Sequence, residues 1–349
     1  MNKQRFIMAN LIYMSPMTGN LFLNLWLENQ LKSLMDKTNL PALRERYDLE
    51  YVLFTDDESL MAISRHPNFM ALGALCEITV IKLNWPADSD RFGSRYGLLS
   101  QMCQQTLRAV FTEPAPGEVD RRNAWLGCWV ADLVFAKGAL PKMLKRLEAG
   151  HDAVFNVPIR SAADSVNHLL AQLPGAPSDL ELFEMAYRNL HHLWTHSTWN
   201  NPYFTRMPYS MLWNSGTGLV AHNFGITPIV FKPSPEMQNM TGGIDSDLPG
   251  MCKNPFWATD WTDAPVAGVE PLSNGHYPSF DHRPASEDVV THWALHGGRD
   301  GQPAVHPNQP AFLDKPLYYP NKAMFNNSDL AVRAVEIASS IQRRIAEAK

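Results

Sequence analysis

Residues 129–156 read WVADLVFAKGALPKMLKRLEAGHDAVFN and contain the pattern that decides the fold. The apolar run from Ala124 to Phe135 predicts a buried strand, Leu140 to Leu147 predicts a helix, and Ala153 to Val157 predicts another strand. Strands that alternate with helices are typical of right-handed crossovers between parallel strands. This stretch therefore predicts part of a mostly parallel sheet that helices flank.

The same alternation runs through the chain upstream of this stretch. Phe6 to Tyr13, Leu49 to Phe54 and Ile78 to Leu83 are apolar runs with strand propensity. Apolar residues also recur at helical spacing from Leu23 to Met35 and from Arg95 to Phe111. We therefore expect one α/β domain over residues 1–235.

The second half of the chain is less regular. Ser178 and Glu181 have the spacing of a capping box, which predicts a helix that runs to about Trp194. Residues 236–325 are rich in Pro, Trp and His, and we expect them to form an irregular lid or acceptor region. Apolar residues at helical spacing predict a terminal helix within residues 326–349.

Composition excludes several classes of protein. The chain has 349 residues and a formal net charge of -5, so a broad basic face for nucleic acid is not expected. The four cysteines stand far apart in the sequence, which favours reduced thiols in the cytoplasm over a disulfide or zinc framework. No apolar run approaches the length of a membrane-spanning helix.

Acidic residues stand where ligands bind in open parallel sheets, beyond the carboxyl ends of the strands. Asp56 and Asp57 follow the second predicted strand, where a carboxylate accepts hydrogen bonds from a base or a ribose, or caps the next helix. Asp132 interrupts an apolar run, and a buried acid is costly unless it is paired, binds a metal or emerges at the sheet edge. Both a functional and a structural role for Asp132 stay open at this point.

The strand–helix alternation, the acid after the second strand and the segment around Asp132 resemble a GT-A glycosyltransferase over about residues 5–235. The resemblance implies a Rossmann-like sheet, a nucleotide-sugar donor such as a UDP-sugar across the strand ends, and a divalent cation, Mn²⁺ or Mg²⁺. That cation would neutralise the diphosphate as a Lewis acid. Asp132 matches the second acid of the family's Asp-x-Asp motif, and Val130 stands at the position of the first.

The resemblance also implies roles for individual residues. His222 would join Asp132 as a metal or diphosphate ligand, and Asp245 or Asp247 would be the base that deprotonates the acceptor. Those two acids lie in the sequence GGIDSD and could equally be ordinary turn residues. The residues predicted to contact the donor are Tyr13, Ser15, Thr55, Asp56, Asp57, Arg95 and Asp132.

Two further groups of residues suit chemistry by their type. Asp260 and Asp263 flank Trp261, and an aromatic ring beside carboxylates suits sugar faces and hydroxyl groups. His192 and His196 are spaced for one helical face, but no third zinc ligand accompanies them.

The sequence thus predicts an enzyme that transfers a sugar from a nucleotide diphosphate to a glycan, lipid-linked or protein acceptor. A bacterial polysaccharide or protein-glycosylation pathway would suit a chain of this kind. A sugar nucleotidyltransferase is one alternative, although the loop from Met14 to Gly19 lacks the cation that such enzymes carry after the first strand. A non-catalytic carbohydrate-binding protein is the other, and Val130 is the residue that favours it.

Overall fold

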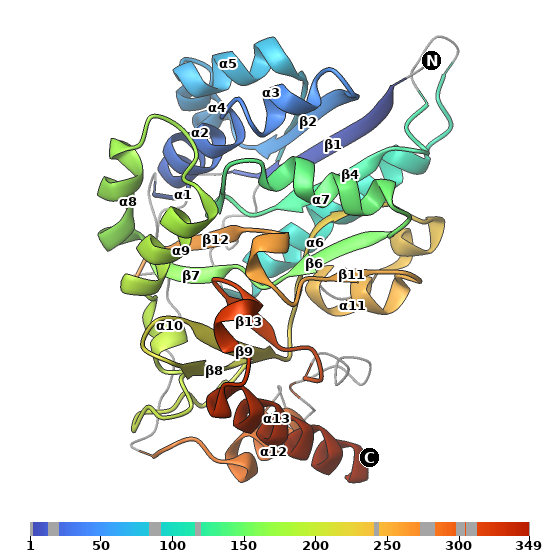
Figure 1. The fold of residues 1–349 in the computed structure, drawn as a ribbon. Helices are drawn as coiled ribbons and strands as arrows, with labels where there is room; N and C mark the ends of the chain where they lie inside the picture. Colours follow the sequence, from blue (N-terminus) through green and yellow to red (C-terminus); the bar gives the residue numbers. More distant parts are fainter. Residues whose placement is uncertain are drawn as a thin grey trace.

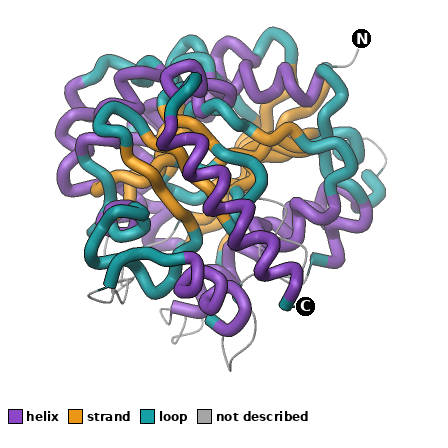
Figure 2. Tube along the Cα trace, turned by 60° about the horizontal axis from the view of Figure 1, so that its bottom comes forward, coloured by secondary structure: helices purple, strands orange, loops and turns teal. Residues whose placement is uncertain are grey.

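The structure is a computed structural model that describes residues 3–12, 21–83, 92–115, 120–240, 244–272, 283–297, 304 and 313–348. It has an α/β fold in which helices flank a seven-stranded sheet, and two smaller three-stranded sheets continue the molecule (Figure 1). Strands lie at the centre of the tube view and helices surround them (Figure 2). The expectation of a mostly parallel sheet with flanking helices is confirmed.

The large sheet has the strand order β11-β6-β10-β4-β1-β2-β3. Strand β1 pairs in parallel with β2 and with β4, β2 pairs in parallel with β3, and β10 is antiparallel to both of its neighbours. The strands span Gln4–Leu11 (β1), Tyr47–Thr55 (β2), Glu77–Lys82 (β3), Trp125–Trp129 (β4), Ala153–Asn156 (β6), Thr227–Phe231 (β10) and Phe256–Trp257 (β11).

Successive side chains of β1 are buried on opposite faces of this sheet, because side-chain direction alternates along a strand. Phe6 and Met8 join the core on one face, and Ile7 and Ala9 join the core on the other. The first face is covered by Leu21–Asn24 (α1), the π-helical Leu25–Gln30 (η1), Leu31–Leu34 (α2), Leu40–Leu43 (α3), Asp57–Ile63 (α4), Pro67–Leu75 (α5) and Ala139–Glu148 (α7). The second face is covered by Phe92–Phe111 (α6), Pro235–Asn239 (η2) and Ile244–Met251 (α11).

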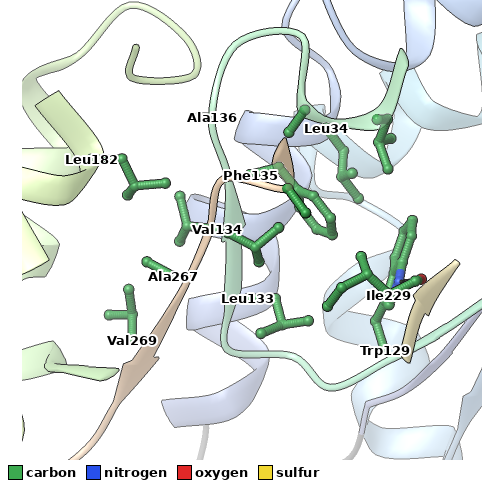
Figure 3. Packing of buried hydrophobic residues seen from close by; sticks show 14 of the residues in the cluster. Leu34, Trp129, Leu133, Val134, Phe135, Ala136, Leu182, Ile229, Ala267 and Val269 are labelled. Atoms are coloured by element: carbon green, nitrogen blue, oxygen red, sulfur yellow. Dashed lines mark hydrogen bonds between the residues drawn. The ribbon is translucent and has the colours of Figure 1, made fainter. Parts of the chain in front are cut away.

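The apolar run from Ala124 to Phe135 was expected to be one strand, and this expectation is wrong. The chain leaves the large sheet at Trp129 and re-forms as β5 (Leu133–Phe135) in a second sheet, of order β5-β12-β7. Figure 3 shows Leu133, Val134 and Phe135 packed between β12 (Val266–Glu270) and the large sheet, where Trp129 donates a 2.7 Å hydrogen bond to the carbonyl of Ile229. Asp132 therefore lies in the link between two sheets.

The second sheet is completed by β7 (Ile159–Ala162) and covered by α8 (Ala163–Gln172) and α9 (Asp179–Arg188). Helix α9 begins at the predicted capping box, in which the Ser178 hydroxyl and the Glu181 carboxylate both engage free backbone amides. The helix ends at Arg188 with Asn189 as its C-cap, and a separate short helix, α10 (His192–Thr195), begins at His192. The expected continuation to Trp194 is therefore wrong.

The third sheet, of order β13-β9-β8, lies below the other two in Figure 1. It packs against the helices α12 and α13, so the expected terminal helix is confirmed. Its elements are Ser210–Asn214 (β8), Leu219–Asn223 (β9), Leu317–Tyr319 (β13), Glu287–His296 (α12) and Asp329–Glu347 (α13), with the 3-10 turns Trp261–Asp263 (η3) and Lys322–Phe325 (η6) nearby.

Residues 236–325 are more regular than their composition suggested. This part of the chain supplies β11 to the large sheet, β12 to the second and β13 to the third, as well as α11 and α12. The strands were missed because each is only two to five residues long, which is too short for a periodicity to be read. Among the described residues, no helix is long and apolar enough to cross a membrane.

Candidate functional site

The strand order creates a switch point between β1 and β4. From β1 the chain builds outward through β2 and β3, and it then returns to place β4 on the opposite side of β1. In open α/β sheets, ligands bind outside the carboxyl ends of the strands at such a point. Here those ends are Leu11 of β1 and Trp129 of β4, with Thr55 closing the neighbouring β2.

Four buried polar atoms near these strand ends have no hydrogen-bond partner among the residues that the structure describes. They are Asn10 Oδ1 in β1, Gln30 Oε1 in η1, Thr55 Oγ1 at the end of β2 and Asp132 Oδ1 after β4. Native proteins pair the large majority of such atoms, so each exception calls for an explanation. These four are among eleven such atoms in the described part of the chain, and their position beside the switch point makes them candidate ligand contacts.

The surroundings of Asn10 and Gln30 hold each amide in one orientation. The Asn10 side-chain amide donates to the Tyr51 hydroxyl, which also accepts a 2.9 Å hydrogen bond from the Trp26 indole. Gln30 donates a 2.7 Å hydrogen bond to the carbonyl of Val130 and closes the π-helical turn, a distortion that is frequent at functional sites. Both side-chain oxygens are left as acceptors next to the strand ends.

Asp132 belongs to a cluster of charged side chains that the second sheet assembles. Burial and, to a smaller extent, the nearby Glu270 raise the pKa of Asp132 to about 7, although the Arg160 guanidinium opposes both. Arg160 Nη1 lies 2.5 Å from Glu270 Oε1, and the Glu270 side chain is only 9% exposed. Asp132 is therefore a buried acid that is partly protonated near neutral pH.

His191 contacts the backbone next to two residues of this cluster, Arg160 and Glu270. Its amide donates a 3.0 Å hydrogen bond to the carbonyl of Arg160, and its Nε2 lies 3.4 Å from the carbonyl of Pro271, next to Glu270. The Leu193 amide donates to Nδ1 at 3.3 Å, so both ring contacts are satisfied by the neutral imidazole with its proton on Nε2. Burial lowers the pKa of His191 and favours the same neutral form.

The predicted donor-binding residues are only partly gathered at the switch point. Thr55 and Asp132 lie there, whereas Asp56 caps α4 by accepting a 2.7 Å hydrogen bond from the Ser59 amide. Asp57 is exposed and pairs with Lys82 at 2.5 Å. Tyr13, Ser15 and the side chain of Arg95 lie outside the described residues.

Asp245 and Asp247 were expected on a flexible loop, but they occupy the first turn of helix α11. The surrounding protein raises the pKa of Asp245 to about 6 through desolvation, and the Arg160 charge opposes that rise. The Arg160 charge acts on Asp245 as it does on Asp132, so α11 brings this acid into the neighbourhood of the charged cluster.

The expected metal pair is not brought together. His222 is buried in β9, where its Nδ1 lies 2.6 Å from the carbonyl of Leu313 and its ring packs edge-on against Trp213. Asp132 instead has Arg160 and Glu270 beside it. A guanidinium that already pairs with Glu270, one of the two carboxyl groups, does not fit a divalent cation, and no group of three His, Cys, Asp or Glu among the described residues could hold one.

The remaining predicted groups have structural contacts. Asp260 caps η3 through the Thr262 amide and also accepts a 2.8 Å hydrogen bond from the Lys322 amide. Asp263 pairs with Arg146 at 2.7 Å. His192 opens the one-turn helix α10 and His196 follows its end, where Nδ1 lies 2.8 Å from the carbonyl of Tyr203.

Sequence reasoning did not select Asn10, Gln30, Arg160, Glu270 or His191 as site residues. Asn10 and Glu270 had a usable signal, since each is a polar residue near the end of an apolar strand. Gln30, Arg160 and His191 had none, because their roles depend on contacts between segments that are far apart in sequence.

No family model matches the chain, and no curated protein matches its sequence. Among solved structures, the chain is similar to 4-diphosphocytidyl-2C-methyl-D-erythritol synthase from Anaerococcus prevotii, with 13% identity over 46% of this chain and 56% of that one, at a TM-score of 0.24. It is also similar to the mannosyltransferase PcManGT from Pyrobaculum calidifontis, solved with GDP-Man and Mn²⁺. That likeness has 14% identity over 99% of this chain and 76% of that chain, at a TM-score of 0.35. Likenesses this distant do not decide what the chain binds or does.

Proposed function

We propose that this protein is a GT-A-type glycosyltransferase that transfers a sugar from a nucleotide diphosphate to a glycan, lipid-linked or protein acceptor. The single observation that carries the proposal is the set of four buried polar atoms beside the β1/β4 switch point that have no hydrogen-bond partner within the described ranges of the chain. A nucleotide sugar offers many donors and acceptors, so it suits a site with several fixed polar groups. The resemblance of the strand–helix pattern and of the Asp132 segment to GT-A enzymes supports the same reading.

In this proposal different strand ends contact different parts of the nucleotide sugar. Asn10 is the second-last residue of β1 and Thr55 is the last residue of β2, which pairs with β1 on the side away from β4, and both would contact the nucleoside. Asp132 would contact the sugar end of the donor, where β5 and β12 continue the site beyond the large sheet. Asp245 is the candidate base for the acceptor, because its pKa is raised to about 6, closer to neutral pH, and the Arg160 charge acts on it.

Turnover of a panel of UDP-, GDP- and CDP-linked sugars, with and without an acceptor mixture, tests the proposal. Hydrolysis is a useful readout, because water competes with the acceptor in such reactions. We expect at least one donor to be hydrolysed by the wild-type protein, and at least 100-fold less by Asp132→Ala. Asp263→Asn is the matched control, because its partner Arg146 lies outside the site, and it should keep wild-type turnover. Equal turnover by Asp132→Ala and wild-type protein would remove Asp132 from the site.

A further inference from the structure

We infer that Asp132, Arg160 and Glu270 form the subsite for the hydroxyl groups of the donor sugar and do not bind its diphosphate. This inference rests on the proposed function and assigns a ligand chemistry to two residues, Arg160 and Glu270, that the sequence did not single out. The subsite is named for what would occupy it: a neutral polyhydroxyl ring.

The three side chains meet because of the register of the second sheet. Gly268 of β12 lies directly opposite Leu133 of β5 on one side and Arg160 of β7 on the other. A Cβ atom at Gly268 would lie 3.7 Å from Arg160 Cγ and 3.9 Å from Glu270 Oε1, so both side chains lie over this glycine. The Val269 amide donates a 2.8 Å hydrogen bond to the Asp132 carbonyl and fixes the third residue.

The balance of charge argues against a phosphate in this subsite. Two carboxyl groups, Asp132 and Glu270, surround the one guanidinium of Arg160, which also acts on the Asp245 carboxylate. A diphosphate would therefore meet more negative than positive charge, in surroundings where burial strengthens the repulsion. A neutral ligand avoids that repulsion.

The hydrogen-bonding capacity of the cluster matches sugar hydroxyl groups. Each hydroxyl both donates and accepts, and here carboxylate oxygens accept while the guanidinium donates. Asp132 Oδ1 has no hydrogen-bond partner in the part of the chain that the structure describes, and the Arg160 side chain remains 44% exposed although it pairs with Glu270. Hydrogen bonds to charged groups of this kind are among the stronger ones available to a neutral ligand.

The test compares a nucleotide with its sugar conjugate on the same proteins. Isothermal titration would measure the Kd of UDP, GDP, UDP-glucose and GDP-mannose for the wild type, Asp132→Asn and Arg160→Gln, with Arg188→Gln as a control for an exposed arginine. We expect both site variants to bind the nucleoside diphosphate within about threefold of wild type. For the nucleotide sugar we expect a loss of about 10- to 100-fold, the range for losing hydrogen bonds to a charged group.

The outcomes distinguish a failure of the sugar subsite from a failure of the proposed function. If Arg160→Gln weakens the nucleotide and the nucleotide sugar equally, Arg160 binds phosphate and the subsite is wrong, while the proposed function stands. If both site variants bind the nucleotide sugar as wild type does, only the subsite is wrong. If the wild type binds no nucleotide and no nucleotide sugar, the proposed function fails and the subsite fails with it. Glu270→Gln, checked by its melting curve, repeats the comparison should either variant fold poorly.

Discussion

Replacing Asp132 by Asn should stabilise the protein most above neutral pH, and the gain should shrink as pH falls and nearly vanish below pH 3.8, the unfolded pKa of Asp132. Asp132 is buried, and its pKa is raised from 3.8 to about 7 by burial and by Glu270. Between these two values the folded state binds more protons than the unfolded state, so the free energy of unfolding falls as pH rises through this window. Asn has no proton to lose and removes that fall.

The size of this stabilisation follows from the pH range between the two pKa values of Asp132, 3.8 when unfolded and about 7 when folded. Each pH unit within it corresponds to about 1.36 kcal/mol, which gives an upper bound of roughly 4 kcal/mol at pH 8. Coupling to Glu270 reduces this, so we expect a gain of about 2–4 kcal/mol. With an unfolding entropy of about 2.1 cal/mol/K per residue, the melting temperature of a 349-residue chain should rise by roughly 3–5 °C.

Thermal melts at pH 5, 6, 7 and 8 would measure this difference between the variant and the wild type. Asp263→Asn is the control, because it removes an acid that is ion-paired with Arg146 and should not stabilise the protein at pH 8. A loss of stability in Asp132→Asn that is equal at pH 5 and pH 8 would refute the reasoning, since it would mean that the carboxylate is well paired. A stabilised variant that has lost turnover would mark Asp132 as a functional residue retained at a cost in stability.

Three further substitutions test the packing, buried charge and capping of the fold. Gly127→Ala should lower the free energy of unfolding by about 1–3 kcal/mol in urea, because its Cβ would lie 2.5 Å from Cζ2 of the buried Trp129, whereas Gly250→Ala, in open space, should cost nothing. Burial lowers the pKa of His222 to about 4, so stability should fall with acidification between about pH 6.5 and 4, and His222→Gln should show a flatter acid limb in pH-dependent melts. Ser178→Ala should cost about 1 kcal/mol in the same urea assay through loss of the capping box, and an unchanged midpoint would contradict that role.

The fold was largely predictable, because it depends on patterns that are local in the sequence. The strand–helix alternation up to β6 required only runs of apolar residues, and the capping box at Ser178 required two residues three apart. The prediction of one continuous strand through Asp132 was wrong, and the reason is physical. An apolar run does not record that the chain changes sheets, since both halves are equally buried and only the exposed Val130 marks the break.

The candidate site was predictable only where one residue carried the signal by itself. Asp132 stood out as an acid in an apolar run, and its unpartnered carboxylate oxygen gives a physical reason for attention to it. Arg160 and Glu270 meet across a pairing of strands more than 100 residues apart, which no short motif encodes. His222 was misleading, because a histidine after an apolar run is equally typical of a buried ring that bonds the backbone, as it does here at Leu313.

Nucleotide binding at the β1/β4 switch point is the central claim, and titration of the wild-type protein with UDP and with GDP tests it most directly. Each titration would be run in EDTA and again with Mn²⁺, and repeated with Thr55→Val, which removes one of the unpartnered oxygens with little change of shape. We expect saturable binding of at least one nucleotide that Thr55→Val weakens. Absence of binding under both conditions, or binding that Thr55→Val leaves unchanged, would contradict the assignment of this site.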